Sequence, residues 1–195
     1  DVNVKRTPND ATALFMAAQN GHTKVVKLLL DHGAQVNNTD DKGVTPLFIA
    51  AQNGYFEVFN LLLDGGAEID ATLFSDGTTA LWIASQNGHA NIVKSLLDKK
   101  AEVNLKDTRN GITALFQASK NGHMKVVKLL LENNANIDIK EVTCGVTPLF
   151  MASENGHTEV VKLLLNKGAK ANVKNIHDGV TALMKARQNG YKKIV

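Results

Sequence analysis

One stretch of sequence recurs through the whole chain. TPLFMASENGHTEVVKLLLNKGA begins at Thr147, and related stretches, the last of them shortened, begin at five other threonines. The six threonines are Thr12, Thr45, Thr79, Thr113, Thr147 and Thr181. The steps between them are 33, 34, 34, 34 and 34 residues. A period of this length is typical of a stacked repeat array, in which each unit packs on its neighbours.

Each unit predicts two short helices and a loop. Thr147 is suited to cap a helix that begins at Pro148, because proline has no N–H to lose at the first helical position. Gly156 ends this helix, since glycine accepts a left-handed turn. A second helix with a broad apolar face is predicted from about Thr158 to Asn166, and residues 169–180 then run out to a tip and back. Neither helix buries its apolar face alone, so the units must stack.

The repeated pattern resembles the ankyrin repeat. It is T-[PA]-L-x-x-A-x-x-x-G-H-x-x-V-V-x-L-L-L-x-x-G-A-x-[VI]-[ND], and its in-phase copies cover essentially the whole chain. The resemblance implies an all-α solenoid of stacked helix-turn-helix units with protruding hairpin loops, here called fingers. It implies much less about function, because such repeats are a scaffold on which different binding sites are built.

We expect a single domain over residues 1–195, with both ends inside a repeat. Residues 1–11 form half of a finger, and residues 181–195 begin a sixth repeat. The complete repeats lie near 12–44, 45–78, 79–112, 113–146 and 147–180. Because neither end carries the polar capping unit that solenoids need, we expect the chain to be an excised part of a longer array. Four of the five complete fingers have one extra residue, which reflects either neutral drift in a loop or taller fingers shaped for a partner.

Composition restricts the class of partner and the compartment. The net charge of +3 is too small to require nucleic acid as a partner. A single cysteine, Cys144, excludes an internal disulfide and suits a reducing compartment. There is no apolar run of about 18 residues and no signal peptide. We therefore expect an intracellular, cytoplasmic monomer without membrane contact.

No pattern of catalytic or metal-binding residues is found. Four histidines recur in the Gly-His corner of successive repeats, and neighbouring repeats are about 10 Å apart, too far to share one zinc ion. These are His22, His89, His123 and His157. Cys144 has no periodic histidine–acid partner, and no glycine loop of the phosphate-binding type is present. We therefore expect no enzyme activity, no metal and no cofactor.

Large apolar residues stand where ankyrin repeats usually have histidine in T-P-L-H. They are Phe15, Phe48, Trp82, Phe116, Phe150 and Met184. The substitution is systematic, which favours apolar packing between units, with ligand contact as the alternative. Trp82 is the largest of them and therefore the most suited to be an exception.

The second helices carry a row of lysines, three of which have an acidic residue four positions later. The row is Lys27, Lys94, Lys128 and Lys162, and the acidic residues are Asp31, Asp98 and Glu132. Pairs at this spacing neutralise each other on a helix surface. We interpret this row as a solvated face, with a nucleic-acid-binding stripe as the alternative.

The finger after the second repeat predicts a partner-binding site. Leu73 and Phe74 are large and apolar on a loop that should be solvated, and adjacent exposed apolar residues are informative. The alternative is that Phe74 folds back on the neighbouring finger. Ile49 and Ile83 belong to a row that faces the concave groove in ankyrin repeats. The predicted site comprises Leu73, Phe74, Trp82, Ile49 and Ile83, with Asp76 and Arg109 on its polar rim.

The resemblance implies a non-catalytic protein–protein interaction module that binds through its concave groove and finger tips. Varied loops on a rigid frame are suited to recognition. The alternative is a small ligand or nucleotide held in the groove between Trp82 and Lys106 or Lys120, as in a few ankyrin domains. A designed binder is a third hypothesis, but designed arrays repeat one framework, whereas this one drifts at T-[PA]-L-[FWM].

Overall fold

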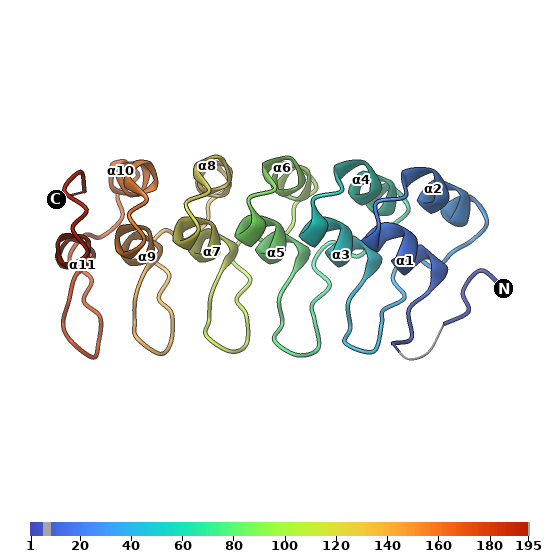
Figure 1. The fold of residues 1–195 in the computed structure, drawn as a ribbon, viewed down its shortest axis with the longest axis horizontal. Coiled ribbons are helices and arrows are strands. Elements are labelled where there is room, and N and C mark those ends of the chain that lie inside the picture. The colour runs from blue at the N-terminus through green and yellow to red at the C-terminus, as the bar shows by residue number, and fades with distance from the viewer. Residues whose placement is uncertain (6–8, 195) are drawn as a thin grey trace. The chain divides into compact units, whose positions relative to one another are not determined.

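The repeating threonines cap helices in the computed structural model, which describes residues 1–5 and 9–194 (Figure 1). The Thr12 hydroxyl accepts a hydrogen bond of 3.2 Å from the N–H of Phe15, and the Thr147 hydroxyl accepts one of 3.3 Å from Phe150. Each hydroxyl satisfies an N–H that has no partner inside the helix. The predicted phase of the repeat is therefore confirmed at its first residue.

Each repeat contributes two helices, and the shortened sixth contributes one. In the described residues they are α1 (Ala13–Gln19), α2 (Thr23–Asp31), α3 (Pro46–Asn53), α4 (Phe56–Asp64), α5 (Ala80–Asn87), α6 (Ala90–Asp98), α7 (Ala114–Lys120), α8 (Met124–Glu132), α9 (Pro148–Glu154), α10 (Thr158–Asn166) and α11 (Ala182–Gln188). α9 begins at Pro148 and α10 has the predicted bounds. The all-α architecture is confirmed.

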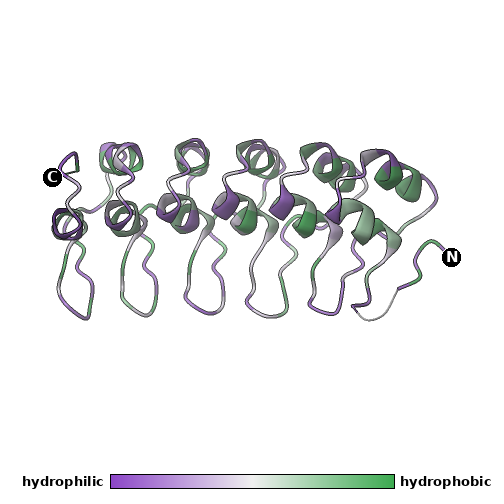
Figure 2. Ribbon diagram, viewed as in Figure 1, coloured by the Kyte–Doolittle hydropathy of each residue, from purple (hydrophilic) through white to green (hydrophobic). Residues whose placement is uncertain are grey.

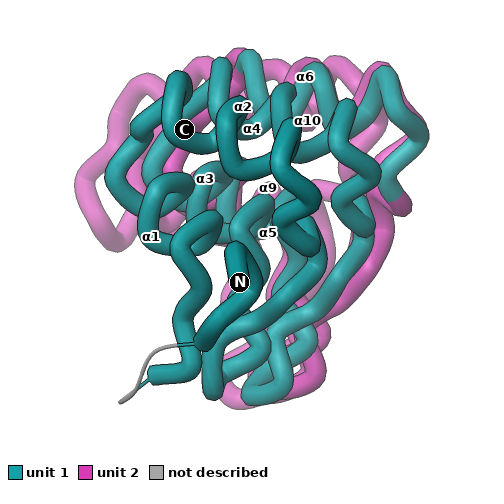
Figure 3. Tube along the Cα trace, turned by 90° about the vertical axis from the view of Figure 1, so that its right-hand side faces the viewer, with its two compact units in different colours: residues 1–84, 91–101 teal, residues 85–90, 102–195 magenta. Residues whose placement is uncertain are grey.

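The chain divides into two compact units, which Figure 3 colours separately. Unit 1 comprises residues 1–84 and 91–101, and unit 2 comprises residues 85–90 and 102–195. In unit 1, α1 packs on α3 and α2 on α4; in unit 2, α7 packs on α9, α9 on α11 and α8 on α10. The single domain over residues 1–195 stays a prediction, and residues 6–8 and 195 of its partial end repeats lie outside the described residues.

Four of the six large apolar residues at the usual histidine position are buried, as packing between repeats predicts. Phe15, Phe48, Phe116 and Phe150 are buried, whereas Trp82 is half-buried and Met184 is exposed. The second helices bury the apolar stripes that their sequences predict, and Leu130 of α8 is among the fully buried side chains. Outside the helices, hydrophobic and hydrophilic residues alternate along the fingers (Figure 2).

Some of the asparagines that recur at the ends of the first helices join neighbouring repeats. In unit 1, the Asn53 side chain donates a 3.0 Å hydrogen bond to the carbonyl oxygen of Gln19. In unit 2, Asn189 donates one of 2.8 Å to Glu154 in the same way. Asn20 and Asn155 instead donate to carbonyl oxygens of their own first helices, those of Met16 and Met151, each at 2.8 Å. The lack of variation at these positions therefore has a structural reason, because these side chains satisfy carbonyls at helix ends.

The second helix of the third repeat ends without the glycine found in other copies. Lys100 takes its place with φ 68, in the left-handed region that Gly33 and Gly66 occupy elsewhere in unit 1. A side chain there costs about 1–2 kcal/mol. We expect Lys100→Gly to stabilise the protein by about 1 kcal/mol, measured by denaturant unfolding. An unchanged or lower midpoint would contradict this expectation.

Candidate functional site

Acidic side chains close most of the fingers. In unit 1, Asp40 Oδ1 accepts hydrogen bonds from the N–H groups of Lys42 (3.0 Å) and Val44 (2.8 Å). In unit 2, Asp107 Oδ1 accepts from Asn110 (2.9 Å) and Ile112 (3.0 Å). These bonds satisfy turn N–H groups that have no partner in a helix or a sheet.

The finger at 68–79 has Leu73 at the position of the closing acid. Its turn is held instead by the backbone and by Asp76, whose Oδ1 accepts hydrogen bonds from the N–H (3.1 Å) and the hydroxyl (2.8 Å) of Thr78. The N–H of Leu73 donates to the Thr78 carbonyl at 3.0 Å. Leu73 itself is half-buried, so it is less exposed than its loop position predicts.

Phe74 is the most exposed large hydrophobic residue described, with 75% of its surface accessible. One face of its ring covers Gly43 on the neighbouring finger of unit 1, so closely that a Cβ on Gly43 would lie 2.6 Å from Cγ of Phe74. Both predicted alternatives therefore hold in part: the ring leans on the next finger, yet most of it faces solvent. A ring held in this way loses little conformational entropy when it is covered.

A pocket of about 480 Å³ adjoins Phe74 between two fingers of unit 1. Phe74 and Gly43 line it together with polar residues, including Thr45, Glu68 and Asp70. An aromatic ring at the edge of a pocket with polar walls offers a partner both apolar contact and hydrogen bonds.

The other apolar residues of the predicted site are more enclosed. Ile49 on α3 and Ile83 on α5 are each only 8% exposed, so they support the surface of unit 1 more than they form it. Trp82 is half-buried, and its indole Nε1 is buried with no hydrogen-bond partner among the described residues. Phe74 is therefore the strongest candidate for an apolar anchor.

The residues of the predicted rim are divided between the units. Asp76 lies in unit 1 beside Phe74, whereas Arg109 lies in unit 2, on the finger at 102–112. Arg109 is exposed and Asp76 is half-buried. A polar rim around an apolar anchor is typical of protein interfaces.

The structure brings forward two residues that the sequence analysis did not select. Val142 and Ile176 occupy the finger position of Phe74 in the repeats of unit 2, and they are 65% and 66% exposed. A comparison of the fingers in register would have found them, because each stands immediately after the residue that closes its finger.

A comparison with known protein families identifies the repeat. The family model described as ankyrin repeats (3 copies) matches residues 1–73, 66–141 and 138–195. The chain belongs to the ankyrin repeat family. No curated protein matches the sequence of the chain. Ankyrin repeats generally serve as protein–protein interaction modules and are typically non-catalytic. No described helix combines the length and the apolar character needed to cross a membrane.

The Gly-His corners of this ankyrin array have a structural role. Nε2 of His157 lies 2.9 Å from the carbonyl oxygen of Lys120, and that of His123 lies 2.9 Å from the carbonyl oxygen of Gln86, both within unit 2. Each imidazole joins two repeats. Among the described residues, no group of three or more His, Cys, Asp or Glu side chains is placed to hold a metal ion.

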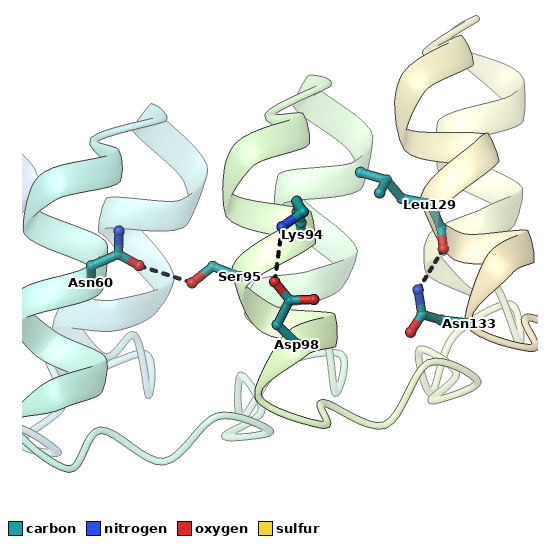
Figure 4. Close-up of polar contacts among 6 residues, drawn as sticks. All are labelled: Asn60, Lys94, Ser95, Asp98, Leu129 and Asn133. Atoms are coloured by element: carbon teal, nitrogen blue, oxygen red, sulfur yellow. Dashed lines mark hydrogen bonds and ion pairs between the residues drawn. The ribbon is translucent and has the colours of Figure 1, made fainter.

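The lysine row of the second helices is partly neutralised. Lys94 pairs with Asp98 at 3.2 Å on α6, as Figure 4 shows, and Lys128 pairs with Glu132 at 3.9 Å on α8. On α6, Ser95 also donates a hydrogen bond of 2.9 Å to Asn60 of α4. This pattern supports the interpretation of a solvated face.

Glu141 closes the finger at 136–146 through both carboxylate oxygens. Thr143 N–H donates to Oε1 at 2.6 Å and Cys144 N–H donates to Oε2 at 2.7 Å. Burial alone would raise the pKa of Glu141. Hydrogen bonds from the Thr143 hydroxyl and from the two N–H groups, together with the charge of nearby His177, outweigh burial and hold the pKa below its ordinary value of 4.5.

This lowered pKa predicts a pH-dependent contribution to stability. The folded protein takes up the proton less readily than the unfolded chain, so the stabilisation is present above the unfolded-state pKa and is lost as the pH falls through the folded-state pKa. We expect Glu141→Gln to make the free energy of unfolding less sensitive to pH between about pH 5 and pH 3. Denaturant titrations across this range test it, and equal pH dependence in both proteins would refute it.

Proposed function

We propose that this ankyrin array is a non-catalytic module that binds a protein partner through its fingers and the adjoining face of the first helices. The exposure of Phe74 carries the proposal, because an aromatic ring that is supported on one side and open on the other is a typical interface anchor. The half-buried Leu73 and Trp82 and the nearly buried Ile49 and Ile83 would form the apolar floor beneath the partner. Asp76, on the same finger as Phe74, would contribute polar contacts at its edge, and Arg109 would do so on its own finger in unit 2.

We expect Phe74→Ala to weaken partner binding by about 1–2 kcal/mol or more while leaving thermal stability nearly unchanged. The reason is that the ring is mostly exposed in the free protein and becomes covered only in the complex. Isothermal titration calorimetry with a partner recovered by affinity capture measures the first quantity, and thermal unfolding measures the second.

Lys128→Ala is the control, because Lys128 lies on a second helix and its partner Glu132 is on the same helix. We expect this change to leave both binding and stability unaffected. If Phe74→Ala unfolds the protein instead, Phe74 is part of the core. If only Lys128→Ala weakens binding, the partner occupies the second-helix face and the proposed site is wrong.

A further inference from the structure

Each finger of unit 2 carries a lysine at the same position. Lys106, Lys140 and Lys174 are spaced by 34 residues on the fingers at 102–112, 136–146 and 170–180. All three are exposed, and within residues 1–5 and 9–194 none has an ion-pair or hydrogen-bond partner. The corresponding residues on two fingers of unit 1 are the neutral Thr39 and Thr72. A third finger of unit 1, at residues 1–11, has Lys5 at this position, so lysines follow one another on neighbouring fingers in unit 2 but not in unit 1.

The acidic groups that follow two of these lysines are directed into the fingers, and on the third finger the exposed Asp178 accepts a 3.0 Å hydrogen bond from the N–H of Val180. Asp107 and Glu141, which directly follow two of these lysines, are buried and accept hydrogen bonds from the N–H groups of their own turns. Other lysines of unit 2 do have acidic partners: Lys170 lies 3.8 Å from Asp138, and Lys185 lies 3.3 Å from Glu154. The three finger lysines are left to interact with groups outside the chain.

Two exposed aliphatic side chains lie beside these lysines. Val142 and Ile176 each stand two residues after a lysine of the row, at the first residue of the turn of their finger. Glu141 separates Lys140 from Val142 and is buried, whereas Lys140 and Val142 are both exposed.

Backbone contacts fix the aliphatic side chains in place. The N–H of Val142 donates to the Asn110 carbonyl, and that of Ile176 to the Cys144 carbonyl, each at 2.9 Å. Each side chain also covers the glycine of the preceding finger, so that a Cβ there would lie 2.9 Å from it. The surface is therefore held in position before any partner arrives.

We propose that the fingers of unit 2 bind an acidic protein segment that lies across them in an extended conformation. Its carboxylates pair with Lys106, Lys140 and Lys174, and its apolar side chains cover Val142 and Ile176. This inference rests on the proposed function in taking the partner to be a protein. Packed repeats are about 10 Å apart and an extended chain advances about 3.3 Å per residue. The bound segment therefore has an acidic residue at about every third position.

The exposed aliphatic side chains of Val142 and Ile176 favour a protein over a nucleic acid as the partner. Single-stranded nucleic acids are bound by basic grooves with aromatic rings for base stacking. Valine and isoleucine offer neither charge nor a stacking surface. They do match the apolar side chains of a peptide.

The test is a selection from a display library of random peptides of about 12 residues, long enough in extended form to cross three fingers. Peptides enriched on the wild-type protein are synthesised and their affinities are measured by calorimetry at low and high salt. We expect acidic residues about three positions apart, and affinity that falls as salt rises. We expect the triple variant Lys106→Gln/Lys140→Gln/Lys174→Gln to bind about tenfold more weakly. Val142→Ser/Ile176→Ser should also weaken binding.

The matched control is Lys125→Gln/Lys128→Gln/Lys162→Gln, which removes the same charge from exposed positions on the second helices of unit 2. We expect it to bind the peptides like the wild type. Selected peptides without acidic residues, or with equal affinity for the first triple variant, would overturn this inference. If those peptides are instead lost with Phe74→Ala, the proposed function survives. If an oligothymidylate of about 20 nucleotides binds in a lysine-dependent way and no peptide is enriched, the ligand is a nucleic acid.

Discussion

Replacing Leu130 with alanine is expected to destabilise the protein by about 2–5 kcal/mol. Leu130 lies on α8 and is 0% exposed, within the apolar stripe that also includes Val126 and Val127. Removing its side chain loses the free energy of transfer from water and leaves a cavity among neighbours that relax only in part. Equilibrium unfolding in denaturant measures the change.

The matched control is Leu165→Ala on α10, because the substitution is the same but this leucine is 43% exposed. We expect a loss well below that of Leu130→Ala, since exposed substitutions usually change stability by about 0.5 kcal/mol or less. Equal losses at the two positions would mean that burial in the repeat does not determine stability.

Gly122→Ala is expected to destabilise the protein by about 2–4 kcal/mol for two separate reasons. Gly122 has φ +76, a conformation that L side chains rarely adopt, and a Cβ there would lie 2.5 Å from Nδ1 of His157. The imidazole cannot move aside without losing its 2.9 Å contact with the Lys120 carbonyl. Thermal and denaturant unfolding measure the loss.

Gly168→Ala separates the two reasons, because Gly168 has φ +88 but no heavy atom within 4 Å of a built Cβ. We expect it to cost only about 1–2 kcal/mol, the backbone part of the effect. Adding His157→Ala to Gly122→Ala should restore the part of the stability that the clash with the ring removes. The stability losses of the two changes should therefore be non-additive. Additive losses would show that the ring does not restrict this glycine.

The sequence predicts the frame of this protein well, because the frame depends on local signals that are repeated. The threonine caps, the start of α9 at Pro148 and the bounds of α10 all follow from residues inside one repeat. The partners of Asn53 and Asn189 in the preceding repeat are known only from the structure, since they depend on contacts 34 or 35 residues away.

The surface is predicted less well, because exposure depends on how neighbouring fingers contact one another. The large apolar side chain of Phe74 is evident from the sequence, but its support on Gly43 is not evident from either residue alone. The loop position of Leu73 predicts exposure, yet Leu73 takes the place of a closing acid and is half-buried. Val142 and Ile176 are smaller side chains, and their exposure follows from the finger position that they share with Phe74.

The most direct test of protein binding through the fingers is amide hydrogen exchange on the free protein and on its complex with a captured protein partner. We predict slower exchange in the complex for the finger at 68–79 around Phe74, with little change in the second helices α4 and α8. Slower exchange in the complex that is confined to the second helices, with exchange in the fingers unchanged, would contradict the proposed function.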